Sequence, residues 1–435
     1  MTASSASASA STPAARPLLP LLVLLFIGSG CAALIYEVVW LQLLSLIVGS
    51  SAISMGVILG TFMGGMCLGS LLLSKYVSRA QNPIRVYAFL ELGIGAFGIL
   101  IPLVLPHVGG LYTAIGGTGM FGIIVRAIFC AICLLPPTLL MGATLPAISR
   151  YVETTPSGVS WLGFFYGGNI FGAVGGSLLA GYYLLRMFDM TTACLVGVAI
   201  NIAVALTALA LSKRSGHTAP AESAAEVSPA TAPGARLVYA TIALSGMSAL
   251  ASEVIWTRLL GLSLGQTTYT FSLILAVFLF GLGIGSSAGS FLARSGARAR
   301  TALGWCQFLL VAALGWAAWS ATQAMPYWPI NPTLNTTFSV VFQVDLVKAL
   351  WMVLPGAILW GASFPLALAA VSQRGQDPGR LVGTVYAANT VGAIIGALVA
   401  SLWLIAAIGT QNGQRVLIAI AAVAALLMLA LRVDD

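Results

Sequence analysis

The stretch SGCAALIYEVVWLQLL at residues 29–44 returns as SGMSALASEVIWTRLL at residues 245–260, about 216 positions further along the chain. Two more pairs follow in the same order, namely LPPTLLMGATLP (135–146) with LPGAILWGASFP (354–365), and GFFYGGNIFGAVGG (163–176) with GTVYAANTVGAIIG (383–396). A shared order and a nearly constant offset indicate a duplicated unit of about half the chain. We therefore expect two copies of one helical arrangement.

The composition indicates that lipid surrounds the folded chain. Hydrophobic residues make up 59% of the sequence and charged residues only 7%, with a mean hydropathy of +1.00. A soluble domain carries about 25% charged residues, and a helix that spans a bilayer needs ~20 apolar residues. Twelve such runs occur, near 18–40, 53–74, 86–105, 122–148, 159–184, 190–212, 237–260, 267–292, 301–324, 339–371, 381–408 and 414–432. The sequence predicts an all-α polytopic membrane protein.

The twelve runs divide into two units of six, and six is an even number. Both units therefore enter the membrane from the same side, which makes a parallel repeat. We expect a disordered tail at 1–17, a first six-helix bundle at 18–212, a linker rich in Ala, Pro and Ser at 213–236, and a second bundle at 237–435.

The basic residues predict the orientation. Most of the 19 Lys and Arg residues fall on one side if the N-terminus is cytoplasmic, as the positive-inside rule requires. We expect a bacterial inner-membrane protein with both termini in the cytoplasm. The pI near 9.4 then reflects this topology and not a nucleic-acid partner, which would need a basic soluble face.

A few ionisable residues lie inside the predicted spans, and such residues usually face a cavity or a partner. They are Glu37, Glu91, Arg126, Glu253, Asp345 and Lys348. Their depths allow two ion pairs, one of Glu37 with Arg126 and one of Glu253 with Lys348. Either these pairs neutralise each other near the outer interface, or they line a pathway for a solute or for protons.

Glu91 stands alone in the third run, where the second unit has Gln307. With no obvious partner it is the best single candidate for a proton site, although a neutral, hydrogen-bonded acid is the alternative. Asn169 and Asn389 are repeat-related amides that offer polar contacts to a solute. Arg258 replaces Gln42 of the first copy, so only the second unit supplies that cation.

Glycines recur at four-residue spacing in the second, fifth, eighth and eleventh runs. They are Gly56, Gly60 and Gly64; Gly168, Gly172 and Gly176; Gly281, Gly285 and Gly289; and Gly392 and Gly396. This spacing gives a smooth helix face that a neighbouring backbone can approach closely. We expect these faces to form the contact on which two bundles rock, with tight static packing as the alternative.

The sequence offers no sign of enzyme or metal chemistry. Cys130 and Cys133 have CxxC spacing, but a zinc site needs four ligands and no second pair accompanies them. Neither a phosphate loop nor a Ser/His/Asp set is present. We expect no catalytic residues, no metal and no cofactor.

The 6+6 plan with basic loops after the second and eighth spans resembles the major facilitator superfamily. The SGxxALxxEVxW stretches and the MGATLP and WGASFP turns resemble more specifically the membrane part of bacterial fused major-facilitator/spermidine synthases, over roughly residues 18–432. This resemblance implies that the first and fourth helices of each unit line a central cavity, and that the second and fifth form the sliding contact. The chain ends at Asp435, so we expect no synthase activity from it.

Transport by alternating access is the function that the sequence favours. The solute would be small and polar or cationic, and the synthase fusion suggests polyamines by analogy. The expected partners are the lipid bilayer and the solute, with no nucleic acid. The alternative is a membrane scaffold, or an assembly partner for a separately encoded synthase or a membrane complex.

Overall fold

The computed structural model describes residues 18–49, 52–76, 81–115, 119–152, 156–214, 234–265, 267–294, 298–328, 337–373 and 378–430. All regular structure in these ranges is helical. The predicted tail at 1–17 and most of the predicted linker at 213–236 lie outside the described residues.

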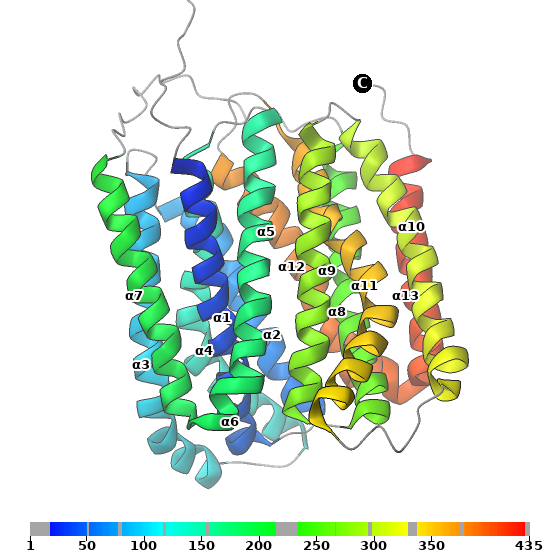
Figure 1. Cartoon of the computed structure of the whole chain (residues 1–435), viewed down its shortest axis with the longest axis horizontal. Helices are drawn as coiled ribbons and strands as arrows, with labels where there is room; N and C mark the ends of the chain where they lie inside the picture. The colour runs from blue at the N-terminus through cyan, green and yellow to red at the C-terminus, as the bar shows by residue number, and fades with distance from the viewer. Residues whose placement is uncertain are drawn as a thin grey trace, which may run out of the picture.

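The first half of the chain forms one group of helices (Figure 1). They are α1 (Leu19–Val48), α2 (Ala52–Tyr76), α3 (Pro83–Ile115), α4 (Gly119–Ser149), α5 (Pro156–Leu178), the π-helix η2 (Leu179–Leu184), α6 (Leu185–Met187) and α7 (Met190–Arg214). The segments α5, η2 and α6 follow one another without a break, so they make a single membrane-length element.

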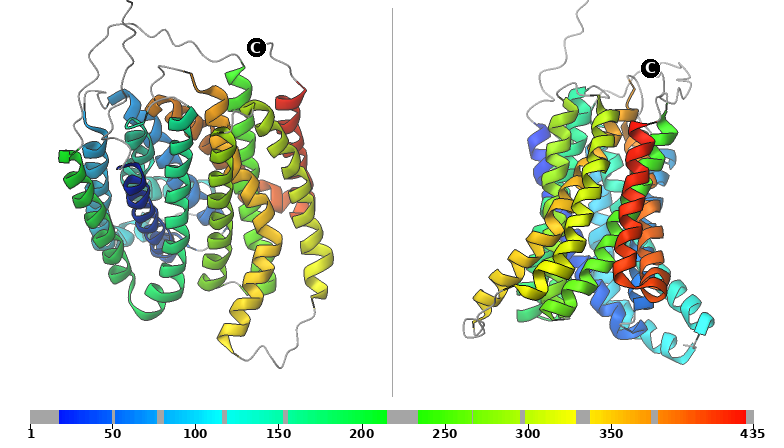
Figure 2. Two further views of the ribbon diagram at one scale, coloured as in Figure 1. Left: turned by 45° about the horizontal axis from the view of Figure 1, so that its top comes forward. Right: turned by 90° about the vertical axis from the view of Figure 1, so that its right-hand side faces the viewer.

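The second half repeats this plan beside the first (Figure 2). Its helices are α8 (Ala235–Leu264), α9 (Thr268–Arg294), α10 (Ala299–Trp319), the π-helix η3 (Ser320–Ala324), the 3-10 helix η4 (Met325–Tyr327), α11 (Phe338–Val371), α12 (Pro378–Val399), the π-helix η6 (Ala400–Leu404) and α13 (Ile405–Leu429).

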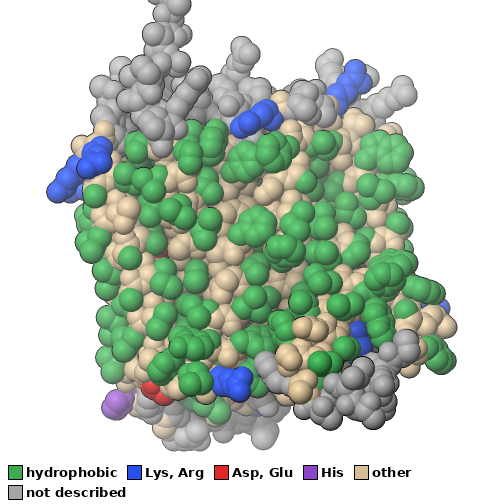
Figure 3. All heavy atoms as spheres, viewed as in Figure 1, with side chains coloured by type: hydrophobic (Ala, Val, Ile, Leu, Met, Phe, Trp, Pro, Cys, Tyr) green, Lys and Arg blue, Asp and Glu red, His purple; other side chains and the backbone are tan. Residues whose placement is uncertain are grey.

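The helices are long and apolar enough to cross a bilayer. Ten described segments meet this criterion, and Gly56–Leu72 adds a shorter apolar helix. The longest segment, Pro378–Leu429, contains a turn at Gly409, whose φ of 77° reverses the chain between two spans. Hydrophobic side chains cover the flank of the molecule and basic side chains gather towards its ends (Figure 3), so the all-α polytopic prediction is confirmed.

The two bundles repeat the same helix packing. In the first, α1 packs on α5, α2 on α4 and α3 on α7; in the second, α8 packs on α12, α9 on α11 and α10 on α13. Between the bundles, α5 packs along α9 and α2 along α12. These are the second and fifth spans of each unit, which the resemblance names as the contact between bundles.

The hydrophobic core differs between the two ends of the molecule. We call the end where α1 begins and α13 ends the basal face, and the opposite end the distal face (Figure 1). At the basal face one cluster joins both bundles, with Phe26 and Phe165 of the first and Phe364 and Val385 of the second. Towards the distal face the core divides into one cluster per bundle, apart from Leu275 of α9, which joins the first. The largest shared hydrophobic cluster thus lies at the basal face, while at the distal end the bundles meet through single contacts such as the 3.2 Å hydrogen bond from the Tyr182 hydroxyl of η2 to the carbonyl of Tyr269 on α9.

Gly56, Gly60 and Gly64 of α2 lie between the bundles, and a Cβ on Gly56 would come 2.6 Å from Ser401 Oγ of η6. A Cβ on Gly60 would come 3.4 Å from Leu398 of α12, and one on Gly64 would come 4.0 Å from Ile394. The last two distances are ordinary side-chain contact, so α2 and α12 approach each other through side chains.

The prediction that the remaining glycines form the contact between bundles is wrong. They pack inside a bundle: Gly168, Gly172 and Gly176 against α1, Gly281 and Gly285 against α11, and Gly392 and Gly396 against α8. Four-residue spacing creates a smooth helix face, but it does not say which neighbour that face meets. Gly163 and Gly167 are the glycines of α5 that face α9.

Candidate functional site

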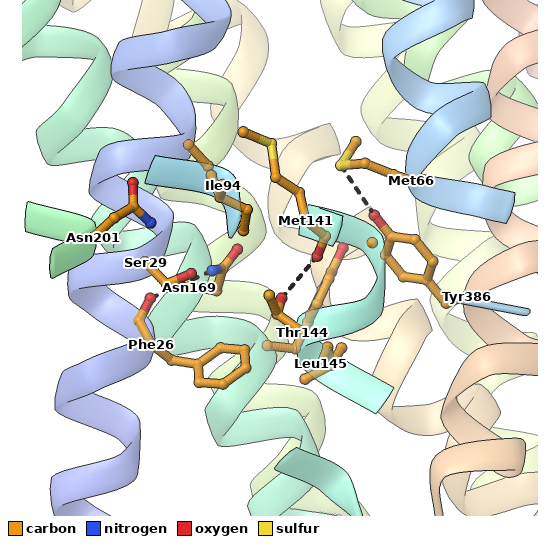
Figure 4. Close-up of a pocket in the computed structure, with 13 residues that line it drawn as sticks. Phe26, Ser29, Met66, Ile94, Met141, Thr144, Leu145, Asn169, Asn201 and Tyr386 are labelled. Atoms are coloured by element: carbon orange, nitrogen blue, oxygen red, sulfur yellow. Dashed lines mark hydrogen bonds between the residues drawn. The ribbon is translucent and has the colours of Figure 1, made fainter. Parts of the chain in front are cut away.

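A cavity of about 80 Å³ lies at the level where the shared basal core ends (Figure 4). Helices of the first bundle form most of its wall, and Tyr386 of α12 contributes from the second. Its wall combines aliphatic and aromatic side chains with methionine thioethers, asparagine amides and hydroxyl groups, and no charged side chain lines it. The lining residues are Phe26, Ser29, Ala33, Met66, Ile94, Met141, Gly142, Thr144, Leu145, Tyr166, Asn169, Asn201 and Tyr386. The volume accommodates several water molecules or a small polar group.

Residue size explains why the cavity lies on the side of the first bundle. Met141 and Leu145 line it from α4, whereas the repeated stretch places Trp360 and Phe364 at the related positions of α11. Trp360 packs on Trp256 with ring centroids 5.5 Å apart, and Phe364 packs on Tyr166 at 4.3 Å. The larger rings fill in the second bundle the space that stays open in the first.

Backbone chemistry adds a polar group to this cavity. Pro146 lies inside α4 and has no N–H to donate to the carbonyl of Gly142, four residues earlier. Gly142 lines the cavity. In a membrane, a carbonyl that the helix leaves without its usual donor is tolerated where it lines a cavity, which agrees with the place of Gly142 in this wall.

Glu91 is fully buried on α3, one side chain behind the cavity wall. Ser29 of α1 donates a 2.5 Å hydrogen bond to Glu91 Oε1, and the Asn201 amide of α7 donates to Oε2. The hydroxyl of Tyr36 in turn donates to Asn201 Oδ1 at 2.9 Å. The premise that Glu91 lacks a partner is therefore wrong, because the partners come from helices distant in sequence.

Gln307 occupies the related position in the second bundle and makes the corresponding contact. Its Nε2 donates to Ser245, the repeat of Ser29, at 3.2 Å and to Ser363 of α11 at 2.7 Å. Gln307 Oε1 is buried and has no hydrogen-bond partner among the described residues. The same hydrogen bond between the first and third spans thus occurs in both bundles, with the acid Glu91 in the first and the amide Gln307 in the second.

Glu37 and Glu253 lie distal to the cavity, on α1 and α8. Each is half-buried, and an electrostatic interaction links the two carboxyls. Glu37 also lines a small cavity of about 10 Å³ with Trp40 and Phe62, which has room for about one water molecule. The related acids of the two units are therefore close enough to interact across the boundary between the bundles.

The predicted ion pairs of these acids do not occur among the described residues. Arg126 donates to Ser54 Oγ at 3.4 Å, and Lys348 interacts with Asp345, one turn away on α11. Depth in the membrane suggested the pairs, but depth does not fix the direction in which a side chain leaves its helix.

The two repeat-related amides have different surroundings. Asn169 donates to the carbonyl of Phe26 at 3.3 Å and reaches the cavity (Figure 4). Asn389 packs its backbone and side-chain oxygens against Gly246. Arg258 is exposed, so the structure does not bring it into the cavity.

Several cavity residues escaped the sequence analysis. Tyr166 and Tyr386 occupy the same place in the repeated stretch of α5 and α12, and this shared position was the available signal. Asn201, a lone amide in the apolar run of α7, was another. Met141 gave no signal, because a methionine in an apolar helix is ordinary core composition.

Comparison with known proteins gives the fold. No family model matches the chain and no curated protein sequence matches it. Among solved structures, the human organic anion transporter MFSD10 (TETRAN) aligns over 96% of this chain and 100% of its own, with a TM-score of 0.62 at 12% identity. The Major Facilitator Superfamily transporter FucP, in its outward conformation, aligns over 95% and 98%, with a TM-score of 0.59 at 16% identity.

A third similar structure is that of a bacterial homologue of the iron transporter ferroportin, in an outward-facing state with soaked iron. It covers 95% of this chain and 98% of its own, with a TM-score of 0.61 at 14% identity. At these identities the likeness shows a major-facilitator fold and does not define a solute. The descriptions of these three structures name transporters and do not mention a spermidine synthase.

Proposed function

We propose that the chain is a solute transporter in which the two bundles give access to the central cavity from alternate sides of the membrane. The observation that carries this proposal is the uneven core, which both bundles share broadly at the basal face and which divides towards the distal face except where α9 joins the first bundle's cluster through Leu275. The cavity lies where the shared core ends, and Tyr386 brings the second bundle into its wall.

The contacts at the basal face describe a closed gate. Ser286 of α9 donates a 3.0 Å hydrogen bond to the carbonyl of Gly163 on α5. On the other side, Gly379 of α12 packs against Pro146 and Arg150 of α4. If the basal face is cytoplasmic, as the basic residues predict, this form is shut towards the cytoplasm. The outward-facing states of two similar structures support that assignment.

The solute class follows from the two acids and from the aromatic wall. Glu37 and Glu253 are repeat-related, half-buried acids with no described cation beside them, so a cationic solute would stabilise their ionised carboxylates. Tyr166, Tyr386 and Phe26 offer ring faces that attract ammonium groups. We propose a small polar or cationic solute. Linear polyamines are the first candidates, by analogy with the synthase-fused branch, a resemblance that the comparisons do not support. In this form of the protein the 80 Å³ cavity would hold only one amine end of such a solute.

Counterflow of labelled spermidine into proteoliposomes tests the proposal. We expect uptake by the wild type, and a loss of about tenfold or more when E37Q or E253Q removes one charge, since each partly buried charge contact is worth about 1–2 kcal/mol. D189N, which removes a carboxylate outside the membrane, is the matched control and should transport normally.

Two outcomes would count against this function. Equal uptake by the wild type, E37Q and E253Q would remove the acids from the pathway. No counterflow of amines, amino acids or organic anions, together with a stoichiometric partner that purifies with the chain, would favour the scaffold.

A further inference from the structure

Glu91 is a buried carboxyl that the transport pathway described above does not use. Its side chain is 0% exposed, yet Ser29 and Asn201, which hold its two oxygens, both line the cavity. Figure 4 shows these two residues at one side of the cavity. A proton from cavity water therefore reaches this carboxyl past a single layer of side chains.

The surroundings of Glu91 suit a proton and not a metal ion. Its oxygens receive the hydroxyl of Ser29 and the amide of Asn201, and the Tyr87 hydroxyl also interacts with it. Metal ions such as Ca²⁺ need six or more oxygen ligands that point towards the ion, whereas donors point towards this carboxyl. No group of three metal-ligating side chains occurs among the described residues.

The ionisable groups that face Glu91 are weak acids. Tyr87 lies on its own helix, Tyr36 on α1 interacts with it electrostatically, and Cys194 on α7 interacts with Tyr36. Among the described residues of α1, α3, α4 and α7, including Arg126 of α4, no lysine or arginine pairs with the carboxyl. An ionised Glu91 therefore depends on hydrogen bonds alone, and a proton is the ligand that removes its charge.

We propose that Glu91 is the proton-binding site that couples transport to the proton gradient. This inference rests on the proposed function. A proton from cavity water binds Glu91 Oε2, which changes that oxygen from an acceptor into a donor. The amide N–H₂ of Asn201 then faces another donor, so the amide must turn its own oxygen towards Glu91.

Rotation of the Asn201 side-chain amide transmits the effect of proton binding towards the distal face. Asn201 Oδ1 leaves the hydroxyl of Tyr36, whose ring stacks on Trp40 with centroids 4.9 Å apart. Tyr36 directly precedes Glu37, the acid at the boundary between the bundles. Proton binding at α3 thus reaches, through the side chains of Asn201 and Tyr36, the turn of α1 that also carries Glu37.

The second bundle provides a natural control for proton binding at Glu91, because it has the same helix arrangement without the acid. Gln307 makes the same contact to the repeated serine, but an amide does not titrate. Ser252 replaces Tyr36 there, and its buried hydroxyl has no hydrogen-bond partner among the described residues. Gln307 also indicates that E91Q will fold, since the repeated frame already accepts glutamine at this position.

The test follows the distance between the bundles as pH changes. Leu46 and Leu262 are repeat-related, lie near the distal ends of α1 and α8 and are 73% and 71% exposed. Spin labels attached there through non-cysteine chemistry, on the full chain in lipid, report the distance by pulsed electron resonance. We expect a reversible shift between acid and mildly alkaline pH in the wild type. E91Q should show the acid distribution at every pH.

Two further variants distinguish proton binding by Glu91 from a purely structural role of this residue. Y36F keeps the aromatic ring and Glu91 but removes the hydroxyl that donates a hydrogen bond to Asn201 Oδ1. The pH-dependent shift in the distance between the labels should therefore fall at least threefold in amplitude. The double variant E91Q/Q307E restores a buried carboxyl in the second bundle, where the tyrosine relay is missing, and should remain unresponsive.

A wild-type pH response in E91Q, or in E91Q/Q307E, would overturn the assignment. So would a wild type whose distances ignore pH but shift when spermidine is added; that result leaves the transporter standing and removes the proton. If E91Q does not fold, an undiminished response in Y36F overturns the proposal by itself.

Discussion

The two bundles share one frame but differ in what the frame holds. In the first, the serine of α1 meets Glu91 at 2.5 Å, and α7 supplies Asn201 to the other oxygen. In the second, the serine of α8 meets Gln307 at 3.2 Å, and α11 supplies Ser363. Thr144, the repeat of Ser363, faces the cavity instead.

This difference shows how a duplicated unit acquires two roles. The first bundle keeps an acid, an open cavity and a tyrosine relay, while the second fills the related space with Trp360 and Phe364. The pattern of helix packing is the same in both bundles, so side-chain differences within one frame separate these states. We infer that the first bundle carries the chemistry and the second acts as the more rigid partner. The predictions below test that division.

The largest effect on stability is expected at Gly172 and Gly392, the repeat-related glycines at which another helix backbone packs closely in each bundle. A Cβ on Gly172 would lie 1.8 Å from the carbonyl oxygen of Ile27, and one on Gly392 would lie 1.8 Å from that of Ala243. Backbone cannot yield as a flexible side chain does, so G172A and G392A should each cost more than ~3 kcal/mol and yield little folded protein.

Two glycines provide matched controls for this prediction. Gly175 on the same helix has nothing within 4 Å of an added Cβ, and Gly60 would meet only the side chain of Leu398 at 3.4 Å. G175A and G60A should therefore fold normally in size-exclusion and thermal-melting assays. Normal folding of G172A would contradict the close packing of α1 on α5.

The second effect concerns the cavity. M141W copies into α4 the ring that Trp360 places in α11, and should fill most of the 80 Å³. We expect spermidine counterflow to fall at least tenfold, while overpacking costs only about 1–3 kcal/mol of stability. Counterflow and melting temperature, measured on the same preparation, separate these effects.

The reverse change in the second bundle sharpens the comparison. W360M removes a ring that packs on Trp256 and donates to Ser248 at 3.0 Å, so it should lower stability by about 2–4 kcal/mol. Transport per folded molecule should persist. If M141W transports normally, or W360M alone abolishes transport, the cavity of the first bundle is not the site.

The sequence predicted the frame well because composition and repetition report it directly. The apolar runs gave the helices, and the repeated stretches gave two like units with the acids Glu37 and Glu253 at related places. These features depend on residues near in sequence, or on a comparison of one half with the other. The contact of α2 with α12 and of α5 with α9 came from the family resemblance.

The sequence could not give the partners of individual side chains. Glu91, Ser29 and Asn201 come from three helices, and their meeting depends on how those helices rotate about their axes. The glycine faces of α5 and α12 were misassigned for the same reason. The cavity depends on volume differences such as Met141 against Trp360, which no motif marks.

The smallest effect is expected at the corner that leads into the sixth span of each bundle. In the first, Asp189 accepts hydrogen bonds from the backbone N–H groups of Thr191 and Thr192 at the start of α7, and from the Thr192 hydroxyl. These donors hold the pKa of the Asp189 carboxyl below its ordinary value. In the second bundle, Gly409 makes the related turn with a φ of 77° and no such cap.

Because the pKa of Asp189 is lower in the folded chain, its contribution is present above the ordinary carboxyl pKa and is lost as pH falls through the folded value. D189A should therefore lower the melting temperature only slightly at neutral pH, by about 1 °C since the group is exposed, and not at all in acid. A melting series against pH for both proteins measures this convergence. A difference that persists unchanged in acid would mean that the carboxylate charge does not cap α7.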